Sequence, residues 1–292
     1  MSAVARLPAA PRARTPGLEA WARLSPDQQR SWLDAAQDAL VAEQVFSPEG
    51  RLHRTAKHLA HEVLERWFSR RGRKVYLGLE EAVFYPDADP FIPDLFAVMD
   101  VADPGPESDR CRWVVAEEKR GIDFVLEVLV HADRRKDLVD NVTFYAALGI
   151  PEYFVYDRKR QKLYGFRLTT VPTPRYVSLE VEDGEIFSEV LGLGLAIEGR
   201  HLRFRNAGCN IPDSRDLAER ATQMLKGHVE RIGAMEGELE SERQRADTER
   251  QRADTEQQRA ETERQRAETE RQRADAAEKA LEALRARLGA EA

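Results

Sequence analysis

The sequence has only two cysteines, Cys111 and Cys209, and neither belongs to a CxxC motif or a cysteine–histidine cluster. This scarcity argues against a disulfide-stabilised secreted domain and predicts two ordinary thiols in a reducing compartment. No stretch approaches the roughly 20 apolar residues of a membrane span. The N-terminal residues 1–17 contain Arg and Pro but no apolar core of a secretory signal. We therefore expect a soluble, cytoplasmic protein without a membrane partner.

Aromatic residues are absent from the C-terminal part of the chain, since all of them lie before Arg205. The last eighty or so residues are almost entirely Glu, Arg, Gln, Ala, Asp and Thr, so the core-forming part precedes them. With 292 residues, the chain is long enough for one sizeable domain and an appendage. We expect a disordered segment at 1–17, a helical lead-in at 18–50, a folded domain at 51–212 and a heptad-repeat helix at 213–290.

An excess of positive charge is also missing. The formal net charge is −7, which argues against a protein that coats nucleic acid by bulk electrostatics but leaves room for a local basic surface. One basic cluster, at residues 70–74, follows the amphipathic segment 55–70. It is either a solvated helix end favoured by the helix dipole or a patch that contacts phosphates.

The C-terminal segment repeats every seven residues from Arg245, as RADTERQ, RADTEQQ, RAETERQ and RAETERQ. One heptad register runs from Ala218 to Leu288, with apolar seams at both ends and Ala paired with Glu in the middle. A strict period of seven predicts a left-handed supercoil. The segment is either a solvated single helix or a coiled coil that forms a homo-oligomer through residues 218–288.

A strand–helix–strand unit is predicted in the middle of the chain. Residues 122–130 are almost continuously apolar, as in a central strand covered on both faces. An amphipathic helix follows at 133–148 and ends at Gly149, a typical C-terminal capping residue. Residues 152–156 then form the next strand, which implies a right-handed parallel crossover. With further short strands, the fold class is α/β, a mixed β-sheet flanked by helices.

Two acids, Asp94 and Glu127, lie inside otherwise apolar strand-like runs. An ionised carboxylate in such a strand is costly unless something pairs with it. Adjacent strands lie about 4.8 Å apart, so both acids could converge on one hard cation such as Mg²⁺, which can activate water. The alternative is a structural ion pair with the nearby Arg134, Arg135 or Lys136.

The order of motifs is more specific than the two acids. PDLF is followed by a hydrophobic strand with Glu-Val-Leu, and then by the run YAALGIPEYFVYD at residues 145–157. From His58 to Phe204 the chain resembles the Uma-two family, regarded as bacterial endonucleases within the PD-(D/E)XK restriction-endonuclease-like superfamily. The resemblance implies a restriction-endonuclease-like mixed β-sheet followed by a coiled-coil tail. It also implies hydrolysis of phosphodiester bonds in DNA with Mg²⁺, or Mn²⁺ in its place.

The resemblance assigns roles by position. Asp94 matches the aspartate of the PD motif, and Glu127 matches the acid of the second motif. Leu129 stands where the superfamily has a lysine, and the helix position to which this family moves the lysine holds Asn141. A lysine can stabilise developing negative charge, whereas an amide offers only a dipole. Lys136 could substitute only by reaching from the start of the helix.

Other candidates are weaker. His131 is either a general base or a turn histidine, and the helix-borne Glu62 and Glu65 either complete the metal site or face solvent. Glu80 and Glu81 are further acids of the same kind. The sequence thus predicts a Mg²⁺-dependent endonuclease. The alternative is a catalytically impaired nuclease-like fold that acts as a binding or assembly module through its coiled coil.

Overall fold

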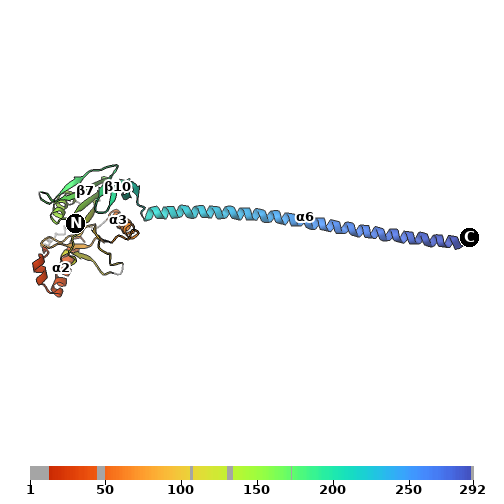
Figure 1. Cartoon of the computed structure of the whole chain (residues 1–292), viewed down its shortest axis with the longest axis horizontal. Helices are drawn as coiled ribbons and strands as arrows, with labels where there is room; N and C mark the ends of the chain where they lie inside the picture. Colours follow the sequence, from red (N-terminus) through yellow and green to blue (C-terminus); the bar gives the residue numbers. More distant parts are fainter. Residues whose placement is uncertain (1–12, 45–49, 106–107, 130–133, 172, 291–292) are drawn as a thin grey trace, which may run out of the picture. The chain divides into compact units, whose positions relative to one another are not determined.

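The computed structural model describes residues 13–44, 50–105, 108–129, 134–171 and 173–290. The chain divides into two units, Met1–Ala218 and Glu219–Ala292, which are taken one at a time below. Figure 1 colours the chain from red at the N-terminus to blue at the C-terminus. Within the described residues, no helix combines the length and apolarity that crossing a membrane would require.

The first unit contains all the strands and every helix except most of α6. The helices are α1 (Leu18–Arg23), α2 (Pro26–Gln44), α3 (Arg51–Ser69), α4 (Val115–Glu118), the π-helix η1 (Lys136–Asp140), α5 (Asn141–Ala147) and α6 (Ser214–Ala290). The strands are β1 (Val75–Leu79), β2 (Ala82–Phe84), β3 (Leu95–Met99), β4 (Arg112–Val114), β5 (Phe124–Leu129), β6 (Glu152–Asp157), β7 (Lys162–Thr169), β8 (Arg175–Leu179), β9 (Glu185–Ser188), β10 (Leu193–Glu198), β11 (His201–Asn206) and β12 (Cys209–Asn210).

The central sheet has six strands in the order β1-β3-β5-β6-β7-β8. β5 and β6 are parallel and the other neighbours are antiparallel, so the sheet is mixed and the predicted parallel crossover is confirmed. Every residue of β5 and β6 is buried, as their continuous apolarity predicts. The predicted mixed sheet with flanking helices and a long C-terminal helix is confirmed.

Both faces of this sheet are covered, because side chains of successive strand residues point to opposite faces. Phe124, Leu126 and Val128 of β5 pack with α3 and with the second sheet, β12-β11-β10-β9. Val125 and Leu129 pack on the other side, where α5 and the loop segments lie. A third cluster joins α1 and α2 to the short parallel pair β2–β4.

Three segments show detail that the sequence pattern does not indicate. The apolar run at residues 75–85, typical of a strand or a hairpin arm, forms two strands in different sheets, because Glu80 interrupts it with a positive φ of 54°. The strand-like run at 113–117 is a strand only as far as Val114, and α4 begins at Val115. The single helix expected at 133–148 consists of the π-helix η1 followed by α5, and residues 130–133 lie outside the described part.

The N-terminal segment is described from residue 13 onward. Thr15 is buried, its N–H donates to the carbonyl of Ala88 at 2.9 Å, and its own carbonyl accepts from the N–H of Asp87 at 3.1 Å. These backbone hydrogen bonds tie residues 13–17, the end of the segment expected to be disordered, to the loop after β2.

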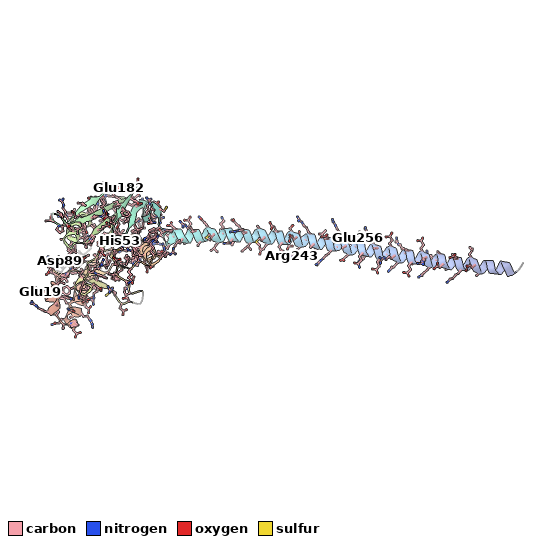
Figure 2. All side chains as sticks on the ribbon, viewed as in Figure 1. Glu19, His53, Asp89, Glu182, Arg243 and Glu256 are labelled. Atoms are coloured by element: carbon pink, nitrogen blue, oxygen red, sulfur yellow. The ribbon has the colours of Figure 1, made fainter. Side chains whose placement is uncertain are left out.

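Helix α6 is a continuous helix of 77 residues, as the heptad repeat predicts. Nearly all of its described side chains beyond Ala218 are exposed, and side chains such as Arg243 and Glu256 project from it (Figure 2). Its four repeat threonines each donate a hydroxyl hydrogen bond to the carbonyl four residues earlier. Association of α6 with another copy stays a prediction.

Candidate active site

The structure brings Asp94 and Glu127 together. Asp94 immediately precedes β3, and Glu127 lies in β5, the antiparallel neighbour in which Leu126 is paired with Leu95. One step further along this register, the two acids are opposite each other. The backbone N–H of Asp94 accordingly lies 3.4 Å from Oε2 of Glu127 and donates to it.

The carboxylate of Asp94 lies among donors. Its Oδ2 accepts a hydrogen bond from the N–H of Val128 at 2.7 Å and lies 2.9 Å from Nε2 of His53. Its Oδ1 is 3.4 Å from the ammonium of Lys57. Burial alone would raise the pKa of Asp94, but the His53 ring and the Lys57 charge, with the backbone donor, hold it below its ordinary value. Asp94 is therefore an anion near neutral pH.

Glu127 is in the opposite electrostatic situation. Only 5% of its surface is exposed, and its Oε1 accepts the hydroxyl hydrogen of Tyr145 at 2.9 Å. Burial and then the negative charge of Asp94 raise the pKa of Glu127 well above its ordinary value, against the opposing charge of Lys136. Two adjacent carboxyl groups with pKa values pushed apart are typical of functional sites.

Lys57 and His53 are two residues beside Asp94 that the sequence prediction missed. Lys57 carries the positive charge. It lies on α3, is 1% exposed, and its ammonium forms ion pairs with the carboxylates of Glu80 and Asp94. The signal was a cation on the apolar stripe of an amphipathic helix, in line with Ala60 and Leu64. The sequence prediction placed the lysine after Glu127, whereas in the structure the lysine beside Asp94 comes from α3, which precedes both acids in the chain.

The two predicted substitutes for that lysine lie on the helical segment that follows β5. Asn141, the first residue of α5, donates its amide to Oδ1 of Asp137 at 3.2 Å. Lys136 is exposed at the start of η1, and its charge reaches Glu127 only as the opposing influence on that pKa. His131 lies outside the described residues.

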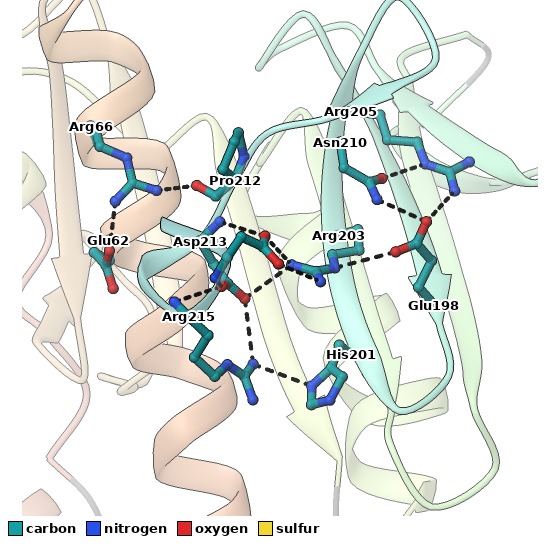
Figure 3. A network of polar contacts seen from close by, with 11 residues as sticks. Glu62, Arg66, Glu198, His201, Arg203, Arg205, Asn210, Pro212, Asp213 and Arg215 are labelled. Carbon is teal, nitrogen blue, oxygen red and sulfur yellow. Dashed lines mark hydrogen bonds and ion pairs between the residues drawn. The ribbon is translucent and has the colours of Figure 1, made fainter. Parts of the chain in front are cut away.

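Of the four additional acids, Glu80 lies at the site through its ion pair with Lys57. Glu62 points elsewhere and pairs with Arg66 at 2.6 Å (Figure 3). Glu65 is exposed, and Glu81 accepts a tyrosine hydroxyl on the far side of the Glu80 turn. The structure therefore does not bring Glu62 to the pair formed by Asp94 and Glu127.

The donor set fits a hydrated hard cation better than a closed metal cage. Asp94 and Glu127 repel each other, as the raised pKa of Glu127 shows, and a divalent ion between them would relieve that repulsion. Mg²⁺ needs only one or two protein carboxylates and keeps several waters. A structural zinc site needs four protein ligands, whereas no group of three or more His, Cys, Asp or Glu with metal-binding geometry occurs among the described residues.

Comparisons with known proteins establish the family of the chain. One solved structure to which the chain is similar is a "putative nuclease belonging to DUF820" from Anabaena variabilis ATCC 29413. Its sequence is 16% identical, its TM-score is 0.40, and the match covers 52% of this chain and 80% of that one. No curated protein matches the chain. The family model "Uma2: Putative restriction endonuclease" matches residues 36–200, which include α3, Asp94 and Glu127. The chain belongs to this Uma2 family.

Proposed function

We propose that this protein is a metal-dependent endonuclease that hydrolyses phosphodiester bonds in DNA. The observation that carries the proposal is the pair Asp94 and Glu127, two buried acids opposite each other on adjacent strands, with the buried cation Lys57 beside Asp94. Membership in the Uma2 family supports the reaction class. The metal, the DNA substrate and the residue roles are the proposed part.

Asp94 and Glu127 would hold Mg²⁺, or Mn²⁺ in its place. When bound, the ion supplies a Lewis acid that orients the phosphodiester and activates a water. Asp94 is already ionised, whereas burial and the charge of Asp94 disfavour the ionised form of Glu127 that a metal needs. The hydroxyl of Tyr145 fixes the orientation of Glu127 through their 2.9 Å hydrogen bond.

Lys57 would supply the positive charge that Asn141 cannot. Its ammonium is held between Asp94 and Glu80, so it stays in place without reorganisation as charge develops on the phosphate. Attack by water forms one phosphorus–oxygen bond and breaks another, and negative charge increases on the phosphoryl oxygens. A pre-placed ammonium stabilises that charge more than the neutral amide of Asn141.

The direct test uses the full-length chain and supercoiled plasmid DNA, with Mg²⁺, Mn²⁺ or EDTA. We expect metal-dependent nicking by the wild type and a loss of at least about 100-fold in Asp94→Asn and in Lys57→Met, since each removes preorganised electrostatic stabilisation. Glu65→Gln, an exposed acid on the same helix as Lys57, is the matched control and should retain activity. Metal-dependent cleavage that is unchanged in Asp94→Asn would overturn the site.

The second candidate is a catalytically impaired nuclease-like fold that binds or assembles. Asn141 at the lysine position of the family motivates it, and its amide is already engaged with Asp137. An inactive wild type that gains cleavage through Asn141→Lys would favour this candidate. Robust cleavage by the wild type would end it.

We also propose that α6 pairs with a second copy of the chain. Leu225, Ile232 and Leu239 recur every seven residues and are 66%, 56% and 49% exposed. A stripe at heptad spacing on one helix fits the same stripe on another copy. Sedimentation equilibrium should therefore give more than one chain mass for the wild type and a lower mass for Ile232→Asn. A monomeric wild type at micromolar concentration would refute this pairing.

A further inference from the structure

Two adjoining grooves follow the outer face of α3. One, of about 430 Å³, is lined by Arg51, Arg54 and His58 together with Glu62. The other, of about 80 Å³, shares Thr55 and Leu59 with the first. Its basic lining comes from other parts of the domain: Arg158, Arg200, His201 and Arg215. Helix α3, the end of β6, the β10–β11 turn and the start of α6 thus contribute to one basic surface.

Four arginines of this surface have no acid partner among the residues that the structure describes. In the described part of the chain, no acid lies within ion-pair distance of the guanidinium groups of Arg51, Arg54, Arg158 and Arg200. By contrast, Arg203 pairs with Asp213 at 3.0 Å (Figure 3). It also pairs with Asp216 at 2.8 Å. In a chain of net charge −7, such a gathering of arginines makes this surface locally basic.

The acid that lines the groove is already neutralised. The carboxylate of Glu62 is bound by Arg66 at 2.6 Å, and the Arg66 guanidinium also donates to the carbonyl of Pro212 (Figure 3). At the other end, Arg215 lies 3.3 Å from Nδ1 of His201 and 3.5 Å from Asp213. The groove therefore keeps a net positive charge.

The helix itself adds to the positive potential. Arg51 and Arg54 lie in the first turn of α3, and that turn contains no acid. The N-terminal end of a helix carries partial positive charge, so cations there are unfavourable unless an anion binds. Nearby arginines also affect His201. Burial first, and then the charges of Arg215, Arg203 and Arg158, lower the pKa of His201. An anionic ligand would relieve both effects.

Two elements, α3 and β6, contribute to both the groove and the surroundings of the candidate active site. Arg158 follows β6 directly, and its backbone N–H donates at 3.0 Å to the carbonyl of Leu129, two residues after Glu127. On α3, Lys57 lies between Arg54 and His58 in sequence and points inward to Asp94. The groove and the candidate active site thus share α3 and the adjoining ends of β5 and β6.

We propose that this groove, formed by Arg51, Arg54, Arg158, Arg200 and Arg215, binds the phosphate backbone of DNA. The inference rests on the proposed function, because it names the surface that holds the substrate of that site. Guanidinium groups match phosphate oxygens in a bidentate manner and read no base sequence. Binding should therefore depend strongly on salt and little on sequence.

The test is fluorescence anisotropy of a labelled 20-base-pair duplex with the full-length chain in EDTA, so that binding is measured without cleavage. The variant is the triple change Arg54→Gln, Arg158→Gln and Arg200→Gln. The control is Arg245→Gln, Arg252→Gln and Arg259→Gln in α6, which changes the net charge equally. Unchanged tryptophan fluorescence would show that the variant remains folded, since all three arginine side chains lie at the surface.

We expect the groove variant to bind at least about tenfold more weakly at 100 mM salt. The slope of log affinity against log salt should fall by about two to three, whereas the control should change less than about twofold. Equal affinities of the two variants would overturn the proposal, as would a wild type without affinity for the duplex. A tenfold preference for an RNA duplex would overturn the assignment to DNA.

The proposed endonuclease function and the proposed DNA-binding groove can be refuted independently. A wild type that binds DNA through the groove but does not cleave it with Mg²⁺ or Mn²⁺ would sink the proposed function and leave this inference standing. A groove variant that binds and cleaves like the wild type would sink this inference alone.

Discussion

Charged residues occupy opposite environments in the folded domain and in α6. In the domain, Lys57 is 1% exposed and Glu127 is 5% exposed, and each is in contact with named partners. In α6, residues such as Arg243 and Glu256 face solvent (Figure 2). A buried charge is costly unless it is paired, whereas exposed ion pairs contribute about 0–1 kcal/mol. The same residue types therefore mark a site in one region and only a solvated surface in the other.

Apolar residues show the reverse contrast. Phe154 of β6 is completely buried among residues from α3, β3 and β10. In α6, Met235 is 69% exposed and Leu225 is 66% exposed. The stability of the domain depends on contacts between distant segments. The stability of α6 depends on local hydrogen bonds and on packing against a partner helix. All four tryptophans precede Arg205, so their fluorescence reports on the domain alone.

The largest expected effect comes from the domain core. Phe154→Ala removes a fully buried aromatic side chain and should lower the free energy of unfolding by about 3–5 kcal/mol. Leu239→Ala in α6 removes an apolar side chain that is 49% exposed and should leave the domain transition unchanged. Urea unfolding followed by tryptophan fluorescence measures both. A loss below about 1 kcal/mol in Phe154→Ala would break the contrast between the two regions.

Metal binding should come next in size. If Asp94 and Glu127 bind Mg²⁺, a concentration 100 times the dissociation constant stabilises the domain by about 2.7 kcal/mol. Thermal unfolding followed by tryptophan fluorescence should therefore shift upward with Mg²⁺ in the wild type and not in Asp94→Asn. Asp247→Asn, an exposed acid of α6, should respond like the wild type. Equal shifts in Asp94→Asn and the wild type would place the ion elsewhere.

The features that were predicted correctly from the sequence are those that the residue pattern of a single segment determines. The apolar run of β5, the following helix and β6 identify the parallel crossover, and the seven-residue repeat identifies α6. Asp94 and Glu127 stood out because each interrupts an apolar run. These features need only the hydrophobic periodicity of one segment.

The sequence did not predict what depends on long-range contact. Lys57 lies on a helix that precedes both acids, and only the packing of α3 against the sheet brings its ammonium to Asp94. The break between β1 and β2 results from the left-handed conformation of Glu80, whose N–H donates to the carbonyl of Asp94 at 3.2 Å. Because that contact joins two segments, no local signal indicates it.

The pH dependence of stability should reveal the raised pKa of Glu127. Its folded pKa is raised well above the ordinary value of 4.5, so its contribution to stability is present below that pH and is lost as the pH rises toward the folded pKa. Raising a pKa by one on folding corresponds to about 1.4 kcal/mol of stability lost across that range. Relative to the wild type, Glu127→Gln should therefore gain stability between pH 5 and pH 8.

Ionisation of Asp94 does not add to the change in stability between pH 5 and pH 8. Its pKa is lowered, so its contribution is present above the ordinary value of 3.8 and is lost only as the pH falls below it. Glu249→Gln in α6 is the matched control, because that side chain is exposed. The measurement is urea unfolding at several pH values. A constant difference between Glu127→Gln and the wild type across this range would show that Glu127 ionises normally.

The smallest effect should come from the glycines of α6. Gly233 lies inside the helix with open space around its Cα, so a methyl group meets no neighbour there. Gly233→Ala should stabilise the local helix by about 1 kcal/mol, because alanine has the higher helix propensity. Circular dichroism at 222 nm should show a higher melting temperature for α6, while tryptophan fluorescence of the domain stays unchanged. A parallel shift in both signals would mean that α6 and the domain unfold as one cooperative unit. That result would contradict the independent unfolding expected from buried, paired charges in the domain and exposed charges in α6.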